Sequence, residues 1–225
     1  MNRGMCPVAA LLLFAAGAKG AGPREERFQY EVKWPSGLGL GEAQMSAARD
    51  GGRWVLEFQI EASVPGFRVM DRYRSIVDDK FCTVEFEKEF EHGSRKGKET
   101  TTFANGKAKR VTAGGGGTSE FAVPACPRDA LAYLFFVREE VARGRIPGPQ
   151  KLYFGSGYEV RVQFAGAEQV KVSEAPLEAD KLRVSVTTTT GKLELDLFLA
   201  RDEERTPALV RVPFAMGNFS MEWVR

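Results

Sequence analysis

The chain has few of the residues that build reactive centres: its 225 residues include one histidine and three cysteines. A zinc site normally draws on several His or Cys ligands, so we expect no metal centre. The one histidine, His92, lies in the polar stretch Glu91–Gly97, which is typical of a solvated loop. The sequence also has no nucleophile-elbow motif. We therefore predict that the protein is not an enzyme and has no catalytic residue, metal or cofactor.

Long apolar runs are also scarce. The run Val8–Ala16 follows Arg3 and precedes small residues, which is the pattern of a secretory signal peptide. We expect a signal peptide at residues 1–20, with cleavage after Ala18 or Gly20. No later segment approaches about 20 apolar residues, so the mature chain should have no membrane span. The expected location is the periplasm, or the outside of the cell.

An excess of charge of one sign is missing as well. Arg3 and Lys19 belong to the expected signal peptide, so 30 of the 32 basic residues remain, against 30 acidic ones. A nearly neutral chain lacks the excess of basic residues that is typical of proteins that bind nucleic acid. About 200 residues can bury one sizeable core without further support, so we expect a single β-rich domain at 21–225.

Two cysteines remain once Cys6 is removed with the signal peptide, namely Cys82 and Cys126. In an oxidising compartment an isolated pair most often forms a disulfide, and the alternative is two free buried thiols. A bridge would connect a strand near residue 82 to the start of a helix. In the chain-entropy model it would stabilise the fold by about 4 kcal/mol.

Alternation of apolar and polar residues is the most frequent pattern in the chain. It is clearest in Arg27–Trp34, Trp54–Ala62 and Phe81–Phe90, and it is typical of strands with one face in water. Further strands are expected at Thr100–Phe103, Lys107–Val111, Lys151–Phe154, Tyr158–Phe164, Leu182–Thr189, Lys192–Leu199, Leu209–Phe214 and Phe219–Val224. About a dozen strands in a small domain predict a mainly β fold, with a strongly curved antiparallel sheet or incomplete barrel.

One stretch reads as a helix, at about residues 127–143. Pro127 suits a first helical turn, and Gly144 suits a left-handed cap after the last. Ala130–Val137 is apolar on all sides, so this part should be enclosed. We therefore expect the sheet to wrap around one central helix.

Aromatic residues are plentiful, with 16 Phe, 5 Tyr and 3 Trp. If the curved sheet does not close completely on the helix, some of them would line a hydrophobic cleft. The alternative is that all of them fill the core. The candidate lining residues are Trp34, Phe58, Tyr133 and Phe136, because large apolar groups on the concave face and the helix would converge there.

Short motifs along most of the mature chain resemble those of one known family. They are Tyr30-x-Val32-x-Trp34 with Gly37 and Gly41, Asp129 and Arg138 nine residues apart, Gly144, Glu168, Arg205-Thr206-Pro207 and Gly217. In this order and spacing the chain resembles the bacterial exported proteins grouped as domain of unknown function 3108. It departs from their pattern at Ala130 and Ala132, where the family usually has Pro and Ser.

The resemblance implies a fold related to periplasmic lipoprotein-carrier proteins, with a curved antiparallel sheet partly wrapped around helix. The resemblance implies no catalytic residue, and the polar residues that it singles out are Asp129 and Arg138. At a spacing of nine they lie on opposite sides of a helix and cannot pair. We expect Asp129 to cap the helix and Arg138 to bridge to a strand or its hairpin; the alternative is that they bind a ligand.

The preferred hypothesis is a non-enzymatic periplasmic binding or carrier module, with a lipid-like or apolar ligand in the concavity of the sheet. The alternative is an envelope structural or assembly factor that acts through protein–protein contacts. A third class, a hydrolase of envelope polymers, would need a cleft with two carboxylates about 5–10 Å apart. The expected partners are thus an apolar small molecule or an envelope protein.

Overall fold

The computed structural model describes residues 24–64, 67–188, 191–214 and 217–225, and the signal peptide predicted at 1–20 lies outside them. In these residues fourteen strands form one antiparallel sheet, and one helix lies against it. The prediction of a mainly β fold is therefore confirmed.

The strands follow one another along the chain as hairpins. In the first half they are β1 (Glu26–Lys33), β2 (Gly39–Asp50), β3 (Arg53–Val64), β4 (Phe67–Val77), β5 (Thr83–His92), β6 (Arg95–Ala104), β7 (Lys107–Thr112) and β8 (Thr118–Ala122). The helix α1 (Ala130–Ala142) comes next. The second half contains β9 (Gln150–Phe154), β10 (Ser156–Val172), β11 (Ala175–Thr187), β12 (Lys192–Ala200), β13 (Pro207–Phe214) and β14 (Gly217–Val224).

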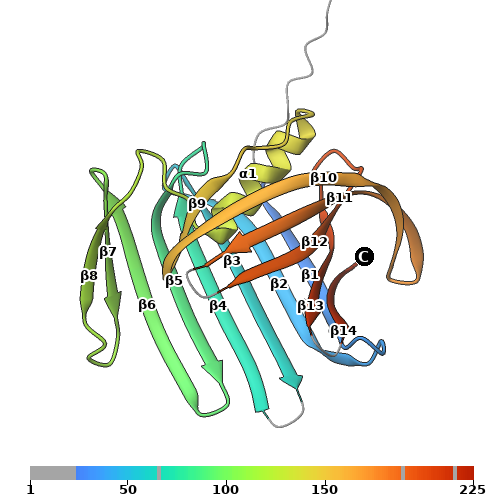
Figure 1. The fold of residues 1–225 in the computed structure, drawn as a ribbon, viewed down its shortest axis with the longest axis horizontal. Helices are drawn as coiled ribbons and strands as arrows, with labels where there is room; N and C mark the ends of the chain where they lie inside the picture. The colour runs from blue at the N-terminus through green and yellow to red at the C-terminus, as the bar shows by residue number, and fades with distance from the viewer. Residues whose placement is uncertain (1–23, 65–66, 189–190, 215–216) are drawn as a thin grey trace, which may run out of the picture.

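The order of the strands makes the sheet an incomplete barrel. The two halves are joined where β1 pairs with β14, and the edges of the sheet are β8 and β9. Figure 1 shows β10–β12 crossing in front of β1–β4, with α1 at the upper end between the two layers. Strong curvature of so large a sheet agrees with the tendency of strands to twist.

The helix packs against both halves of the sheet. Its residues Leu131, Ala132 and Phe135 belong to one core cluster with residues of β1–β4. Its residues Tyr133, Val137 and Val141 belong to a second cluster with residues of β9–β12. The predicted central helix is thus confirmed, and it fills one end of the curved sheet.

The helix begins later than the sequence predicted, at Ala130 instead of Pro127. The carbonyl oxygen of Pro127 accepts a hydrogen bond from the amide of Thr83 (2.8 Å), and that of Arg128 accepts one from the amide of Tyr153 (2.9 Å). These long-range bonds hold the segment between β5 and β9, so its backbone is extended up to Asp129. At the other end Gly144 is left-handed as predicted, with φ of 72°.

The enclosed part of the helix is also smaller than predicted. Ala130 is exposed, and Leu134 and Phe136 are half-buried. The two halves of the sheet cover two faces of the helix, and the remaining sides are left partly open. The prediction that all of Ala130–Val137 is enclosed is therefore wrong at these positions.

Two further predictions about single residues are corrected by the fold. Trp34 lies beyond the end of β1, where the register with β2 shifts, and its ring contacts that of Phe219 at 4.7 Å. His92 is the last residue of β5 and not part of a loop. Its Nε2 lies 2.7 Å from Oδ1 of Asp71 on the neighbouring strand β4.

The far end of the long β10–β11 hairpin folds over the outer face of the sheet and forms a second layer there. Its register shifts between Phe164 and Gly166, and the part beyond the shift packs on the outer face of β12–β14. Phe198 and Leu209 point away from the helix, but the β10–β11 hairpin covers and buries them. Apolar residues on the outer face therefore do not mark an open surface here.

Candidate functional site

The burial of inward-facing residues changes along β3. On β3, Trp54 is 4% exposed and Leu56 is fully buried, whereas Phe58 and Ile60, next on the same face, are half-buried. Side chains at alternate positions of a strand share one face, so the change occurs along a single wall. The helix covers the wall at Leu56, the wall is partly open at Phe58 and Ile60, and Ala62 beyond them is buried again at 6% exposed.

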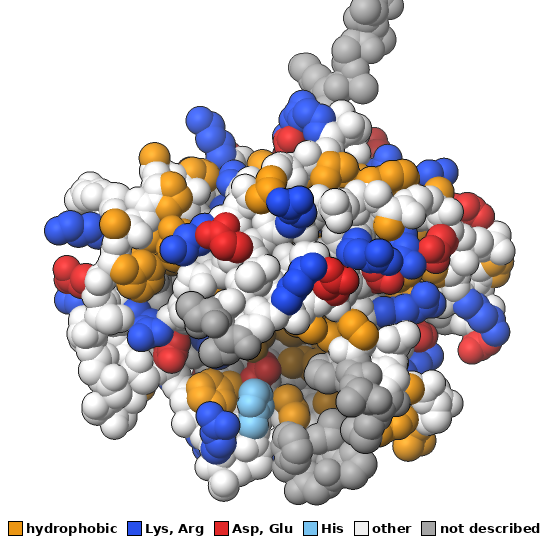
Figure 2. All heavy atoms as spheres, in the orientation of Figure 1, with side chains coloured by type: hydrophobic (Ala, Val, Ile, Leu, Met, Phe, Trp, Pro, Cys, Tyr) orange, Lys and Arg blue, Asp and Glu red, His pale blue; other side chains and the backbone are white. Residues whose placement is uncertain are grey.

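The opposite wall shows the same change at β11 and β12. Leu182 is fully buried and its cross-strand neighbour Leu197 is 6% exposed, whereas Val184 and its neighbour Leu195 are half-buried. Two apolar walls that cross one another thus each contain half-buried residues, on β3 at Phe58 and Ile60 and on β11 and β12 toward the turn between them. We call the space between them the hollow, lined by Phe58, Ile60, Val184, Val186 and Leu195. Figure 2 shows a recess in the lower part of the molecule, with hydrophobic side chains along it.

A strip of polar side chains runs along β4 and β5 on the same concave side. The ring of Tyr73 stacks on that of Phe58 with 6.0 Å between centroids. Burial, with the nearby carboxylate of Asp71, raises the pKa of Tyr73 above its usual range. Asp71 in turn contacts His92, whose side chain is 41% exposed. The concave side is therefore amphipathic, with β3, β11 and β12 apolar and β4–β5 mixed.

The structure does not bring the four predicted lining residues together. Phe58 lies in the wall of the hollow, whereas Trp34 lies in the turn after β1. Tyr133 and Phe136 are 6.2 Å apart on the helix, and the guanidinium of Arg128 covers the Phe136 ring at 3.8 Å. Burial raises the pKa of Tyr133 to about 12, against the lowering effect of Arg128. Of the four, Phe58 has the clearest place in the hollow.

Asp129 is the N-cap of the helix, as predicted. Its Oδ1 accepts hydrogen bonds from the amides of Leu131 (2.8 Å) and Ala132 (3.1 Å), and its Oδ2 accepts one from the hydroxyl of Thr83 (2.8 Å). The side chain is fully buried, and burial raises the pKa of the carboxyl despite these bonds. The role of Asp129 is to fix the start of α1 against β5.

The raised pKa of Asp129 predicts a pH dependence of stability. A raised pKa in the folded state stabilises the fold fully below the pKa of the unfolded chain, about 4, and this contribution is lost as pH rises through the folded value. The free energy of unfolding of the wild type, relative to Asp129→Asn, should therefore fall as pH rises above about 4. Urea titrations of both proteins across a pH series measure this difference, and a constant or rising difference would contradict the prediction.

Arg138 joins the helix to two other parts of the fold. Its guanidinium binds both carboxylate oxygens of Glu26 on β1, and it donates to the carbonyl oxygens of Glu204 (2.9 Å) and Arg205 (3.1 Å) before β13. It also lies 4.8 Å from the ring of Phe135. The predicted salt bridge to a strand is confirmed, and Arg205 of the family motif is part of the same contact.

Cys82 and Cys126 form a disulfide with their Cα atoms 4.8 Å apart. The bond lies beside the hydrogen bond between Thr83 and Pro127, so it fixes the segment before α1 to the start of β5. The predicted bridge is thus present in the structure, and the alternative of two free thiols is not. The helix is held at its N-terminus by a covalent bond and a buried cap.

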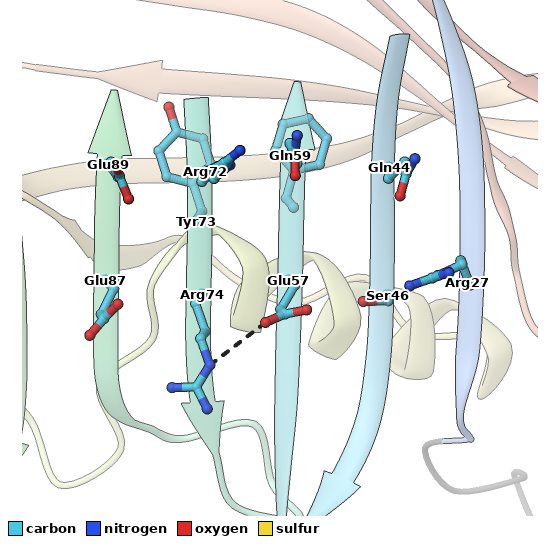
Figure 3. Close-up of a pocket in the computed structure, with 11 residues that line it drawn as sticks. Arg27, Gln44, Ser46, Glu57, Gln59, Arg72, Tyr73, Arg74, Glu87 and Glu89 are labelled. Atoms are coloured by element: carbon cyan, nitrogen blue, oxygen red, sulfur yellow. Dashed lines mark ion pairs between the residues drawn. The ribbon is translucent and has the colours of Figure 1, made fainter. Parts of the chain in front are cut away.

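The outer face of β1–β5 carries a shallow groove of about 290 Å³. In Figure 3 the polar side chains of the outer face lie in front of the strands with α1 visible behind them, whereas the ring of Tyr73 belongs to the concave side. The labelled residues are Arg27, Gln44, Ser46, Glu57, Gln59, Arg72, Tyr73, Arg74, Glu87 and Glu89. Cations and anions alternate across the strands, as in the pair of Arg74 and Glu57 at 3.7 Å. This face is polar and open, in contrast to the hollow on the other side of the sheet.

The described residues offer no cluster for a metal ion and no membrane-spanning helix. They contain no group of three or more His, Cys, Asp or Glu side chains that could hold a metal ion. No helix in this part of the chain is long and apolar enough to cross a membrane.

The curved antiparallel sheet around one helix places the chain among β-barrel-like proteins. Residues 29–224 match the model of a protein family described as "Protein of unknown function (DUF3108)", and the chain belongs to this family. The family expected from the sequence motifs is thereby confirmed. None of the curated proteins matches the sequence.

The fold is similar to that of a solved structure. It is described as a β-barrel-like protein of domain of unknown function DUF1849 from Brucella abortus. The TM-score is 0.66, and the match covers 89% of this chain and 96% of that one. The sequences are only 8% identical, so the likeness concerns the fold alone.

Proposed function

We propose that this protein is a non-enzymatic binding or carrier module of the periplasm or the cell exterior, which holds a lipid-like ligand in the hollow. The observation that carries the proposal is the partial burial of apolar residues on both walls, Phe58 and Ile60 on β3 and Val184 and Leu195 on β11 and β12. Half-buried apolar groups that face one another across a concavity gain free energy when a ligand excludes water from them. The Cys82–Cys126 disulfide supports an oxidising compartment.

A substitution inside the hollow tests the proposal. We expect the wild type to bind the neutral fluorescent probe N-phenyl-1-naphthylamine saturably. Val184→Glu should weaken this binding about tenfold or more, because a charge would then line the space that the apolar probe occupies. The matched control is Val111→Glu, at an exposed position of β7. Circular dichroism checks that both variants fold.

Two results would count against the proposal. One is a wild-type protein that does not bind the probe saturably. The other is a folded Val184→Glu variant that binds it as tightly as Val111→Glu does.

A second candidate function, an envelope assembly factor, is favoured by the outer edge of β8, which pairs with no strand among the described residues. An exposed strand edge offers backbone groups to an extended segment of another protein. Recovery of one stoichiometric envelope protein with the purified chain, with no lipid present, would favour this function over ligand binding.

A further inference from the structure

Lys88 is a charged residue at an inward-facing position of β5. Its cross-strand neighbour on β4 is Tyr73, whose own neighbour on β3 is Phe58 in the wall of the hollow. Phe86 and Phe90, two positions before and two positions after Lys88, share its face of the strand. Lys88 therefore lies at the level of the hollow and on its concave side.

The ammonium group of Lys88 lies among aromatic rings. Its Nζ is 5.3 Å from the centroid of the Phe90 ring and 5.3 Å from that of the Phe154 ring on β9. The Phe90 ring packs over Gly97 of β6, where a Cβ atom would collide with it at 2.5 Å. The ring next to Lys88 is thus held flat against the sheet, and the side chain of Lys88 is half-buried above it.

Lys88 forms no ion pair with any residue that the structure describes. The acidic group on the same wall, Asp71, is engaged by His92. Glu99 is next to Lys88 across the ladder, but its carboxylate lies at the turn of Gly155. A half-buried cation without a counter-ion is only partly stabilised by ring faces, so it favours an anion from elsewhere.

We propose that the ligand of the hollow is an amphiphile with an acidic head group, a carboxylate or a phosphate, which Lys88 binds. The tail lies along the apolar walls of β3, β11 and β12. This inference rests on the proposed function and names the chemical class of its ligand. A lysine contacts such a group as a point charge with three donors, so both acids fit.

Ligands with one chain and different heads test the assignment. The probes are decanoate, decyl phosphate and decanol, measured below their micelle concentrations by displacement of N-phenyl-1-naphthylamine. The wild type should bind at least one of the acids about tenfold more tightly than the alcohol, the usual strength of a hydrogen bond to a charged group. The acid that binds more tightly identifies the source of the head group.

Variants at Lys88 should remove this preference selectively. Lys88→Met keeps the length of the side chain without the charge, so it should bind all three probes as weakly as the wild type binds decanol. Lys88→Arg should retain the preference. The matched control, Lys98→Met, changes a lysine on the outer face of the neighbouring strand β6 and should behave as the wild type.

The outcomes separate the two proposals. If decanol binds and neither acid binds more tightly, or if Lys88→Met keeps the preference, the head-group assignment is wrong and the hollow remains a binding site. If the wild type does not bind N-phenyl-1-naphthylamine saturably, ligand binding in the hollow itself fails, and the assignment with it; if it binds the probe and none of the three displaces it, the head-group assignment alone is wrong. The comparison of acid and alcohol in the wild type needs no variant, so a variant that does not fold leaves the test intact.

Discussion

Replacing Arg138 with methionine should lower the free energy of unfolding by about 3–5 kcal/mol. The substitution leaves the carboxylate of Glu26, whose side chain is only 13% exposed, without its cation. It also removes the donors to the carbonyl groups of Glu204 and Arg205. Because these contacts connect α1, β1 and the start of β13, their loss should loosen the helix from both halves of the sheet. Urea denaturation measures the effect.

A second substitution separates the buried charge from the lost packing. Adding Glu26→Gln to Arg138→Met should recover part of the stability, because the unpaired carboxylate is then gone. The matched control is Arg143→Met, on the exposed end of the same helix, where the ion pairs with Glu139 and Glu140 are worth about 1 kcal/mol or less. Equal losses for Arg138→Met and Arg143→Met would show that the buried bridge does not hold the helix.

Removing the disulfide should have an effect of similar size. The bond closes a loop with a sequence separation of 44 residues, so the double variant Cys82→Ser, Cys126→Ser should lose about 4 kcal/mol of stability. The loss arises chiefly because the unfolded chain gains conformational freedom. Melting curves of the wild type with and without reductant, beside those of the double variant, measure it.

The wild type in reductant should have the same melting temperature as the double variant, and the melting temperature of the oxidised wild type should be well above both. A melting temperature that is the same in all three samples would contradict a stabilising bridge. It would also leave the N-cap at Asp129 as the main contact that fixes the segment before the helix.

The sequence predicted those features that depend on neighbouring residues. Alternation located eleven of the fourteen described strands but missed β2, β4 and β8, and the apolar stretch near Leu131 located the central helix. The start of the helix was missed because the backbone of Pro127 and Arg128 bonds to β5 and β9, which are distant in sequence. The place of Trp34 was missed because a register shift ends the pairing of β1 with β2.

The polar side of the hollow was also missed. The pairing of His92 with Asp71 depends on the register of β4 and β5, which composition does not reveal. Lys88 did leave a signal, since it interrupts the apolar face formed by Phe86 and Phe90 in an otherwise alternating strand. A charged residue at an inward position of a strand is a reason to look for a site.

Native mass spectrometry of the protein purified from its own cellular compartment tests ligand binding in the hollow most directly. The account predicts the mass of the mature chain plus one amphiphile with an acidic head group, released when the protein is denatured. The spectrum of the Val184→Glu variant should lack this added mass. A wild-type spectrum with the mass of the chain alone would contradict the account.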